Sequence, residues 1–85
     1  MFINKTQDGK NNVCGRKVAE RRKELHLSQR ALADRLQNDG LDVDKNAIQR
    51  IESGQRFVTD IELLFLKRAL GLTLDELLPF EPTGN

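Results

Sequence analysis

The amino-acid sequence predicts an all-α protein, a compact bundle of five short helices. Helix-start signals recur four times within the 85 residues, and apolar residues follow each of them at helical spacing. No segment shows a sustained alternation of β-branched residues, so no β-strand is predicted. A chain of this length has room for one small domain.

The chain opens with a polar segment, and a first helix follows it. Residues 1–12 show no period and are predicted to form a flexible N-terminal arm. Good helix formers occupy 13–25, with apolar residues at Val18, Ala19 and Leu25, so a helix is expected there. It has no strong capping residue, and its start is therefore poorly defined.

The next four helices share one start signal, a capping residue with an apolar residue before it and another four positions into the helix. The capping residues are Ser28, Asp44, Thr59 and Thr73, which predicts helix starts near 29, 45, 60 and 74. Gly54 and Gly71 are expected to end the third and fourth helices. Pro79 then separates the domain, residues 13–79, from a C-terminal tail over 80–85.

The small net charge of +1 conceals an uneven distribution. Residues 1–56 hold 12 Lys and Arg against 8 Asp and Glu, whereas residues 57–85 hold 2 against 5. The N-terminal part therefore carries +4 and the C-terminal part −3. This asymmetry is compatible with a nucleic-acid partner for the basic part.

Catalysis and metal binding have little support in this sequence. His26 and Cys14 are single residues of their kinds, so neither a catalytic pair nor a metal-ligand set is expected, and no cofactor is predicted. The longest aliphatic and aromatic run has four residues, far short of the roughly 20 of a spanning helix. A lone cysteine and the lack of a signal segment favour a cytoplasmic protein. Because no catalytic pair is expected, the protein is predicted not to be an enzyme.

The third predicted helix has two distinct faces. Ala47, Ile48 and Ile51 form an inner stripe. The outward residues are of the types that read base edges: Lys45, Asn46, Gln49 and Arg50. The start of the second helix, Ser28-Gln29-Arg30, offers backbone N–H groups and a positive dipole end for a phosphate. On composition alone, a merely solvated helix face is an equally good interpretation.

A family resemblance favours DNA binding. The motifs are Arg22-Lys23-Glu24-Leu25-His26-Leu27-Ser28-Gln29, Ala31-Leu32-Ala33-Asp34-Arg35-Leu36, Ile48-Gln49-Arg50-Ile51-Glu52-Ser53-Gly54-Gln55-Arg56 and Ala69-Leu70-Gly71-Leu72-Thr73-Leu74-Asp75-Glu76-Leu77-Leu78. From Arg16 to Leu78 the chain resembles Cro/repressor-type (XRE-like, lambda-repressor-like) helix-turn-helix domains. The resemblance implies that the third helix enters the major groove of DNA while the second crosses the backbone.

The same resemblance implies roles for individual residues. The base-contacting positions are occupied by Lys45, Asn46, Gln49 and Arg50. The phosphate-contacting positions are occupied by Arg16, Lys17, Ser28, Gln29, Arg30, Ser53, Gln55 and Arg56. Glu52 is expected to have a structural role instead.

Two departures from the family pattern affect this picture. His26 replaces the glycine usual in the first turn, so a residue with a Cβ must accept a left-handed or altered conformation there. The turn over 37–43 is longer than the usual 3–4 residues. It also brings Asp39, Asp42 and Asp44 near the DNA face, where they would repel phosphate unless turned away.

The C-terminal part has more apolar residues than one buried helix face requires. Most are expected in the core, but an exposed patch suited to pairing is predicted from Ile61, Phe65, Leu78 and Phe80. We therefore expect a sequence-specific DNA-binding regulator, a repressor that binds a two-part operator in double-stranded DNA as a homodimer. The alternatives are an antitoxin-like protein that binds a toxin and autoregulates its operon, and a pure protein-interaction domain.

Overall fold

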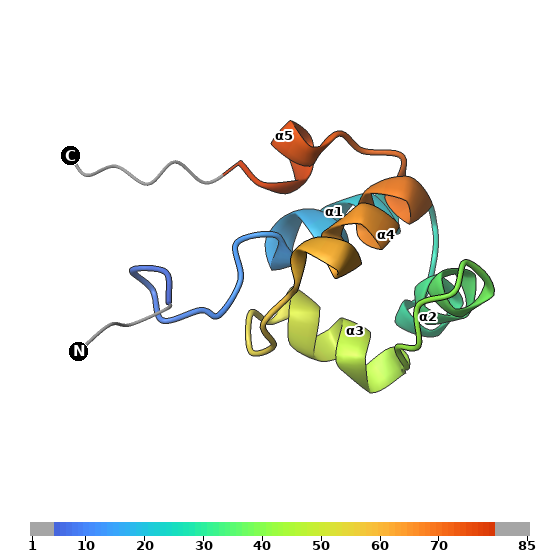
Figure 1. Ribbon diagram of the computed structural model, residues 1–85, viewed down its shortest axis with the longest axis horizontal. Helices are drawn as coiled ribbons and strands as arrows, with labels where there is room; N and C mark the ends of the chain where they lie inside the picture. Colours follow the sequence, from blue (N-terminus) through green and yellow to red (C-terminus); the bar gives the residue numbers. More distant parts are fainter. Residues whose placement is uncertain (1–4, 80–85) are drawn as a thin grey trace.

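The computed structural model describes residues 5–79, in which five α-helices form the domain (Figure 1). They are α1 (Gly15–Glu24), α2 (Gln29–Asn38), α3 (Lys45–Glu52), α4 (Asp60–Leu70) and α5 (Leu74–Leu77). The described range contains no strand, so the all-α prediction is confirmed. Nor does any helix in it have the length and apolar character needed to cross a membrane.

Local capping determines where four of the helices begin. The side chains of Ser28, Asp44, Thr59 and Thr73 each accept a hydrogen bond from the backbone N–H three residues further on. Glu62 and Glu76 return a bond to the capping residue's own N–H and so complete two capping boxes. All four helices therefore begin at the predicted residues.

Helices α1 to α4 are each followed by a residue with positive φ. Gly54 and Gly71 take φ values of +81° and +66° after α3 and α4, as the sequence predicts. Gly40 does the same after α2, at +107°. After α1 the position is occupied by His26, at +58°, where its N–H donates to the carbonyl of Lys23. The altered geometry expected at this histidine is confirmed.

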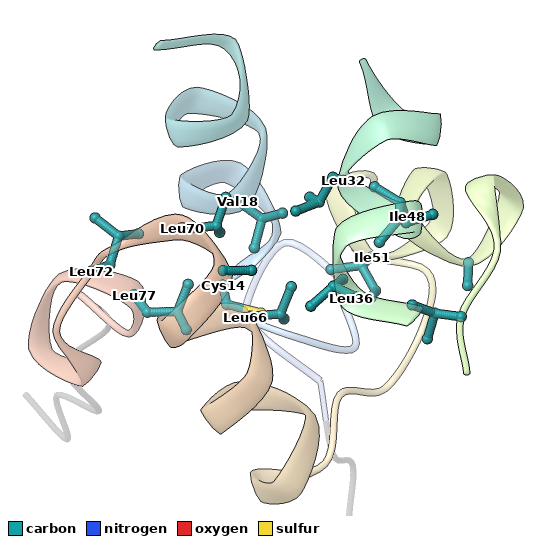
Figure 2. Packing of buried hydrophobic residues seen from close by; sticks show 14 residues of the cluster. Cys14, Val18, Leu32, Leu36, Ile48, Ile51, Leu66, Leu70, Leu72 and Leu77 are labelled. Atoms are coloured by element: carbon teal, nitrogen blue, oxygen red, sulfur yellow. The ribbon is translucent and has the colours of Figure 1, made fainter. Parts of the chain in front are cut away.

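The hydrophobic core lies between α1, α4 and α5 on one side and α2 and α3 on the other (Figure 2). Its fully buried side chains are Cys14, Val18, Leu32, Leu36, Ile48, Ile51, Leu66, Leu70 and Leu77. Burial raises the pKa of the Cys14 thiol to about 11, so this side chain packs as a neutral apolar group.

The long turn between α2 and α3 is tied to both helices. The N–H of Leu41 donates to the carbonyl of Leu36, and the Gln37 amide donates to the carbonyl of Val43 at 2.7 Å. Val43 is buried, and Leu41 packs against the core. The extra residues therefore cover apolar surface while still delivering Asp44 to the start of α3.

Candidate nucleic-acid interface

Helix α3 presents one buried face and one exposed polar face. Ala47, Ile48 and Ile51 are buried in the core, as predicted. The opposite side consists of exposed residues: Lys45, Asn46, Gln49 and Arg50. Such a helix is fixed by its apolar side and free to use its polar side in recognition.

A nearly buried ion pair joins α1 to the end of α3. Arg22 Nε and Nη2 donate to the two carboxylate oxygens of Glu52 at 2.6 Å and 3.0 Å, and these side chains are only 11% and 9% exposed. The hydrogen bond to Glu52 raises the pKa of Arg22. Gln29 Nε2 donates to the same carboxylate at 3.0 Å, which adds α2 to the connection. Three helices thus meet at Glu52, and this fixes the orientation of α3.

The predicted phosphate-contacting residues of α2 lie at its N-terminus. Ser28 Oγ accepts from Ala31 N–H at 2.9 Å, which leaves its own hydroxyl proton available for donation. Gln29 is half-buried, and its amide has a second N–H besides the one directed at Glu52. Arg30 is exposed. This end of α2 therefore presents three side-chain donors together with backbone N–H groups that the helix cannot use itself.

The structure brings residues of α2 and α3 into one shallow groove. It is lined by Arg30, Ala33, Asp34, Gln37, Asp44, Lys45 and Asn46. The Asp44 carboxylate in this groove accepts from Ala47 N–H at 2.8 Å, so it serves α3 as a cap. Asp39 and Asp42 are exposed in the turn. The groove therefore combines cationic, amide and acidic groups, which suits selective contacts better than uniform attraction to phosphate.

The turn after α3 holds three further predicted phosphate contacts. Ser53 Oγ donates to the carbonyl of Arg50 at 3.2 Å, and Gln55 is exposed. Arg56, however, donates both of its Nη groups to Glu62, at 3.1 Å and 3.0 Å. Its charge is therefore largely balanced within the domain, which the sequence did not indicate.

Asn12 binds the start of α1 to both ends of this turn. Its amide nitrogen donates to the carbonyls of Ile51, at 3.1 Å, and Arg56, at 2.8 Å. Its side-chain oxygen accepts from Gly15 N–H at 2.8 Å. Asn12 thus caps α1, whose sequence shows no strong capping residue. An asparagine three residues before a helix with a weak start was the one available signal.

Gly15 and Arg16 show how closely α1 approaches α3. A Cβ on Gly15 would lie 2.2 Å from the Ile51 carbonyl oxygen, so only glycine fits here. Arg16 is exposed, and Lys17 Nζ lies 3.7 Å from Glu20 in a weak surface pair. The start of α1 therefore lies beside the end of α3, with both predicted cations at its surface.

The predicted pairing patch is only partly exposed. Ile61 is 63% exposed, but Phe65 and Leu78 are half-buried against the core, and Phe80 lies outside the described residues. Phe65 turns inward because the α2–α3 turn lies over it: a Cβ on Gly40 would be 3.9 Å from its ring. Two large apolar residues not singled out from the sequence, Phe57 and Leu64, are instead 57% and 56% exposed.

The fold and the exposed polar face of α3 define a helix-turn-helix protein of the transcription-regulator class. The helix-turn-helix family model HTH_3 matches residues 18–77. The chain belongs to this family, the XRE-type helix-turn-helix domains, in agreement with the resemblance seen in the sequence.

Two solved structures are similar to this chain. The P22 c2 repressor, in complex with synthetic operator 9T, is 30% identical and has a TM-score of 0.66 over 79% of this chain and 94% of its own. The restriction-modification controller protein C.AhdI from Aeromonas hydrophila is 32% identical, with a TM-score of 0.64 over 74% and 88%. No curated protein matches the chain.

Proposed function

We propose that this chain is a DNA-binding transcription regulator that binds a two-part operator as a homodimer and acts as a repressor. The family supports the coarser statement, a DNA-binding regulator. The observation that carries the proposal is the exposed polar face of α3 on a helix held rigidly by Arg22, Gln29 and Glu52. A solvated helix would have no need of so firm an orientation.

The proposed assignment of residues to base contacts and phosphate contacts follows from side-chain chemistry. The proposed base contacts come from Lys45, Asn46, Gln49 and Arg50, whose amide and cationic groups match base edges in the major groove. The proposed phosphate contacts come from Arg16, Lys17, Ser28, Gln29, Arg30, Ser53, Gln55 and Arg56. Phosphate contacts fix the position and orientation of the protein on the duplex, whereas base contacts determine which DNA sequence is bound. For Arg56 the proposed contact requires that the guanidinium turn part of its fork away from Glu62.

The homodimer is proposed to form through the apolar surface at the N-terminal half of α4. Phe57, Ile61 and Leu64 are its exposed members, and Ile61 and Leu64 are three residues apart on one helix face. Phe65 and Leu78, the other described members of the predicted patch, are half-buried against the core. Two copies would then present two α3 helices to half-sites about 34–36 Å apart.

Selection from a pool of random-sequence DNA duplexes tests the function directly. We expect the purified chain to enrich duplexes that carry two related half-sites, and binding should weaken as the salt concentration rises because phosphate contacts release counterions. A scrambled version of the enriched sequence is the control. Failure to enrich any sequence, with no duplex binding even at low salt, would contradict the proposed function.

Single substitutions on α3 test the assignment of base contacts. Asn46→Ala and Gln49→Ala should each weaken binding to the selected sequence by about 1–3 kcal/mol and relax the preference at one base pair. Asn46 and Gln49 are both exposed, so folding should be unaffected by these substitutions. Unchanged base preferences in both variants would show that another surface reads the DNA.

A further inference from the structure

The segment before α1 is attached to the turn that follows α3, the proposed recognition helix. The backbone N–H of Asn11 donates to the carbonyl of Gly54 at 2.7 Å, and its side-chain amide donates to the carbonyl of Gln55 at 2.7 Å. Asn12 adds its two bonds to the ends of the same turn. Figure 1 shows this segment beside the turn although the bonded residues are 44 positions apart in the sequence.

These bonds place Lys10 directly on the turn. A Cβ on the buried Gly54 would come within 2.6–2.9 Å of Lys10 Cβ, Cγ and Cδ, so the aliphatic stem of Lys10 lies flat against that glycine. Lys10 is itself exposed, and it lines one groove together with Arg16, Lys17 and Gly54. The same groove also includes the acidic residues Asp8, Glu20 and Glu52. Its ammonium group is therefore carried on the surface formed by the turn after α3 and the start of α1.

The charge balance of this surface favours a role for Lys10. The turn's own cation, Arg56, is committed to Glu62 through two hydrogen bonds, and its neighbours Ser53 and Gln55 are neutral. Within residues 5–79 Lys10 makes no ion pair. Arg50, in the last turn of α3, also makes no ion pair within these residues, and Asp8 lines the same groove as Lys10. A phosphate arriving at this turn would therefore meet Lys10 as a second positive charge beside Arg50, supplied by the N-terminal segment.

We infer that Lys10 contacts a DNA phosphate beside the C-terminal end of the recognition helix, and that Asn11 and Asn12 are positioning residues that hold it there. This inference rests on the proposed DNA binding and extends the interface to the segment before α1, which the sequence predicts to be part of a flexible arm. Phosphate contacts carry no sequence information, so Lys10 should contribute equally on any duplex.

The salt dependence of DNA binding distinguishes a phosphate contact from a structural effect. DNA binding is measured on a labelled mixed-sequence 30-base-pair duplex. The slope of log affinity against log salt is negative, and Lys10→Gln should make it less steep by about 0.9. The same relation predicts a loss of about 8-fold at 0.1 M salt that vanishes near 1 M. Lys10→Arg keeps the charge and should keep the slope. The matched control is Lys67→Gln, an exposed lysine in the last turn of α4, which should leave binding unchanged.

The positioning role is tested by combining variants. Asn11→Ala removes the side-chain bond to Gln55 and leaves the backbone bond and Asn12 in place, so the domain should stay folded. In this background the effect of Lys10→Gln should become smaller, because the segment has lost one of the bonds that hold it on the turn. Thermal unfolding of each variant confirms that the folded state is being compared.

The outcomes separate the two proposals. If the unsubstituted chain binds no duplex at low salt, the proposed function fails. If it binds, and Lys10→Gln has the same slope as the unsubstituted chain, the inference about Lys10 is wrong while the function stands. If Lys10→Gln makes the salt slope less steep by the same amount with and without Asn11→Ala, Lys10 contacts phosphate but Asn11 does not position it. The positioning role of Asn11 is then overturned.

Discussion

At the scale of single residues, His26 stands where the chain needs a left-handed conformation. Its φ of +58° costs a residue with a Cβ about 1–2 kcal/mol relative to ordinary helical geometry. His26→Gly should therefore raise the free energy of unfolding by about 1 kcal/mol, since glycine adopts this conformation without strain but is more flexible when unfolded. Urea denaturation followed by circular dichroism measures this change.

The opposite substitution provides the control for His26. Gly71 has φ of +66°, and a Cβ there would meet no atom closer than 3.8 Å, so Gly71→Ala introduces backbone strain without a clash. It should lower the free energy of unfolding by about 1 kcal/mol. If His26→Gly were also destabilising, the imidazole would be making a contact worth more than the strain it carries.

Glu52 is the residue on which the orientation of α3 depends most. Its carboxylate accepts from Arg22 and Gln29 while only 9% exposed, so removing it leaves a nearly buried guanidinium without its partner. Glu52→Ala should lower the free energy of unfolding by about 3 kcal/mol. Glu24→Ala is the matched control, because its pair with Arg21 lies on the surface and contributes at most about 1 kcal/mol. Equal losses in the two variants would mean that burial of the Arg22 pair has no energetic consequence.

At the scale of elements, the first turn of α4 is joined to the turn after α3 by the ion pair of Glu62 with Arg56. Burial would raise the pKa of Glu62, but the hydrogen bonds from Arg56 and from the Thr59 backbone outweigh it and hold this pKa below the usual 4.5. A depressed pKa means that the folded state binds the proton less readily than the unfolded state. The stabilisation is thus fully present above about pH 4.5 and is lost as the pH falls through the folded-state value.

This linkage predicts how the domain responds to acid. Glu62→Gln should reduce stability at pH 7, and the gap to the unsubstituted chain should narrow as the pH falls below 4.5. Measuring the free energy of unfolding from pH 3 to pH 7 for both proteins tests the prediction. Curves that stay parallel over the whole range would show that Glu62 titrates normally in the folded state.

The turn between α2 and α3 shows how an insertion is accommodated within one element. Val43 is buried and Asp44 caps α3, so the turn still ends with the apolar residue and the capping residue that start this helix. The remaining length lies over Phe65 on α4. The longer α2–α3 turn and the phenyl ring of Phe65 therefore fit each other, because the turn covers the ring.

At the scale of the whole molecule, the features that the sequence predicts well are those that depend on local contacts. Helix starts at Ser28, Asp44, Thr59 and Thr73 depend on contacts within three residues, and the phase of α3 follows from its apolar stripe. Helix α4 is different: apolar residues lie on most of its sides, so spacing alone does not decide which of them face the core. Packing against α1, α2 and the long turn decides that Phe65 turns inward and Leu64 outward.

The parts of the site that the sequence did not indicate all depend on contacts between distant segments. The bonds of Asn11 and Asn12 to the turn after α3 span 39 to 44 residues. The pairing of Arg22 with Glu52 spans 30. The sequence predicts the kinds of side chain at such positions, but their partners become known only when the helices are placed in space. The candidate base contacts were accessible to prediction because they lie together on one short helix.

The dimer is the prediction that belongs to the whole molecule. Ile61 is 63% exposed, and Phe57 and Leu64 are 57% and 56% exposed, so a monomer would leave these three large apolar side chains in water. Ile61→Asp should therefore shift the chain from dimer to monomer in sedimentation equilibrium. It should also reduce binding to a two-part operator far more than binding to a single half-site. Stability should change little, because the side chain makes its contacts in the second copy.

A matched substitution on another element locates the interface. Leu74, on α5, is 39% exposed, so Leu74→Asp makes the same chemical change on a different surface and should leave the dimer intact. Dissociation by Leu74→Asp and not by Ile61→Asp would move the interface to α5. If the unsubstituted chain were monomeric at concentrations that saturate its operator, the proposed dimer through α4 would be wrong. Two independent half-site contacts, rather than a dimer, would then have to account for operator binding.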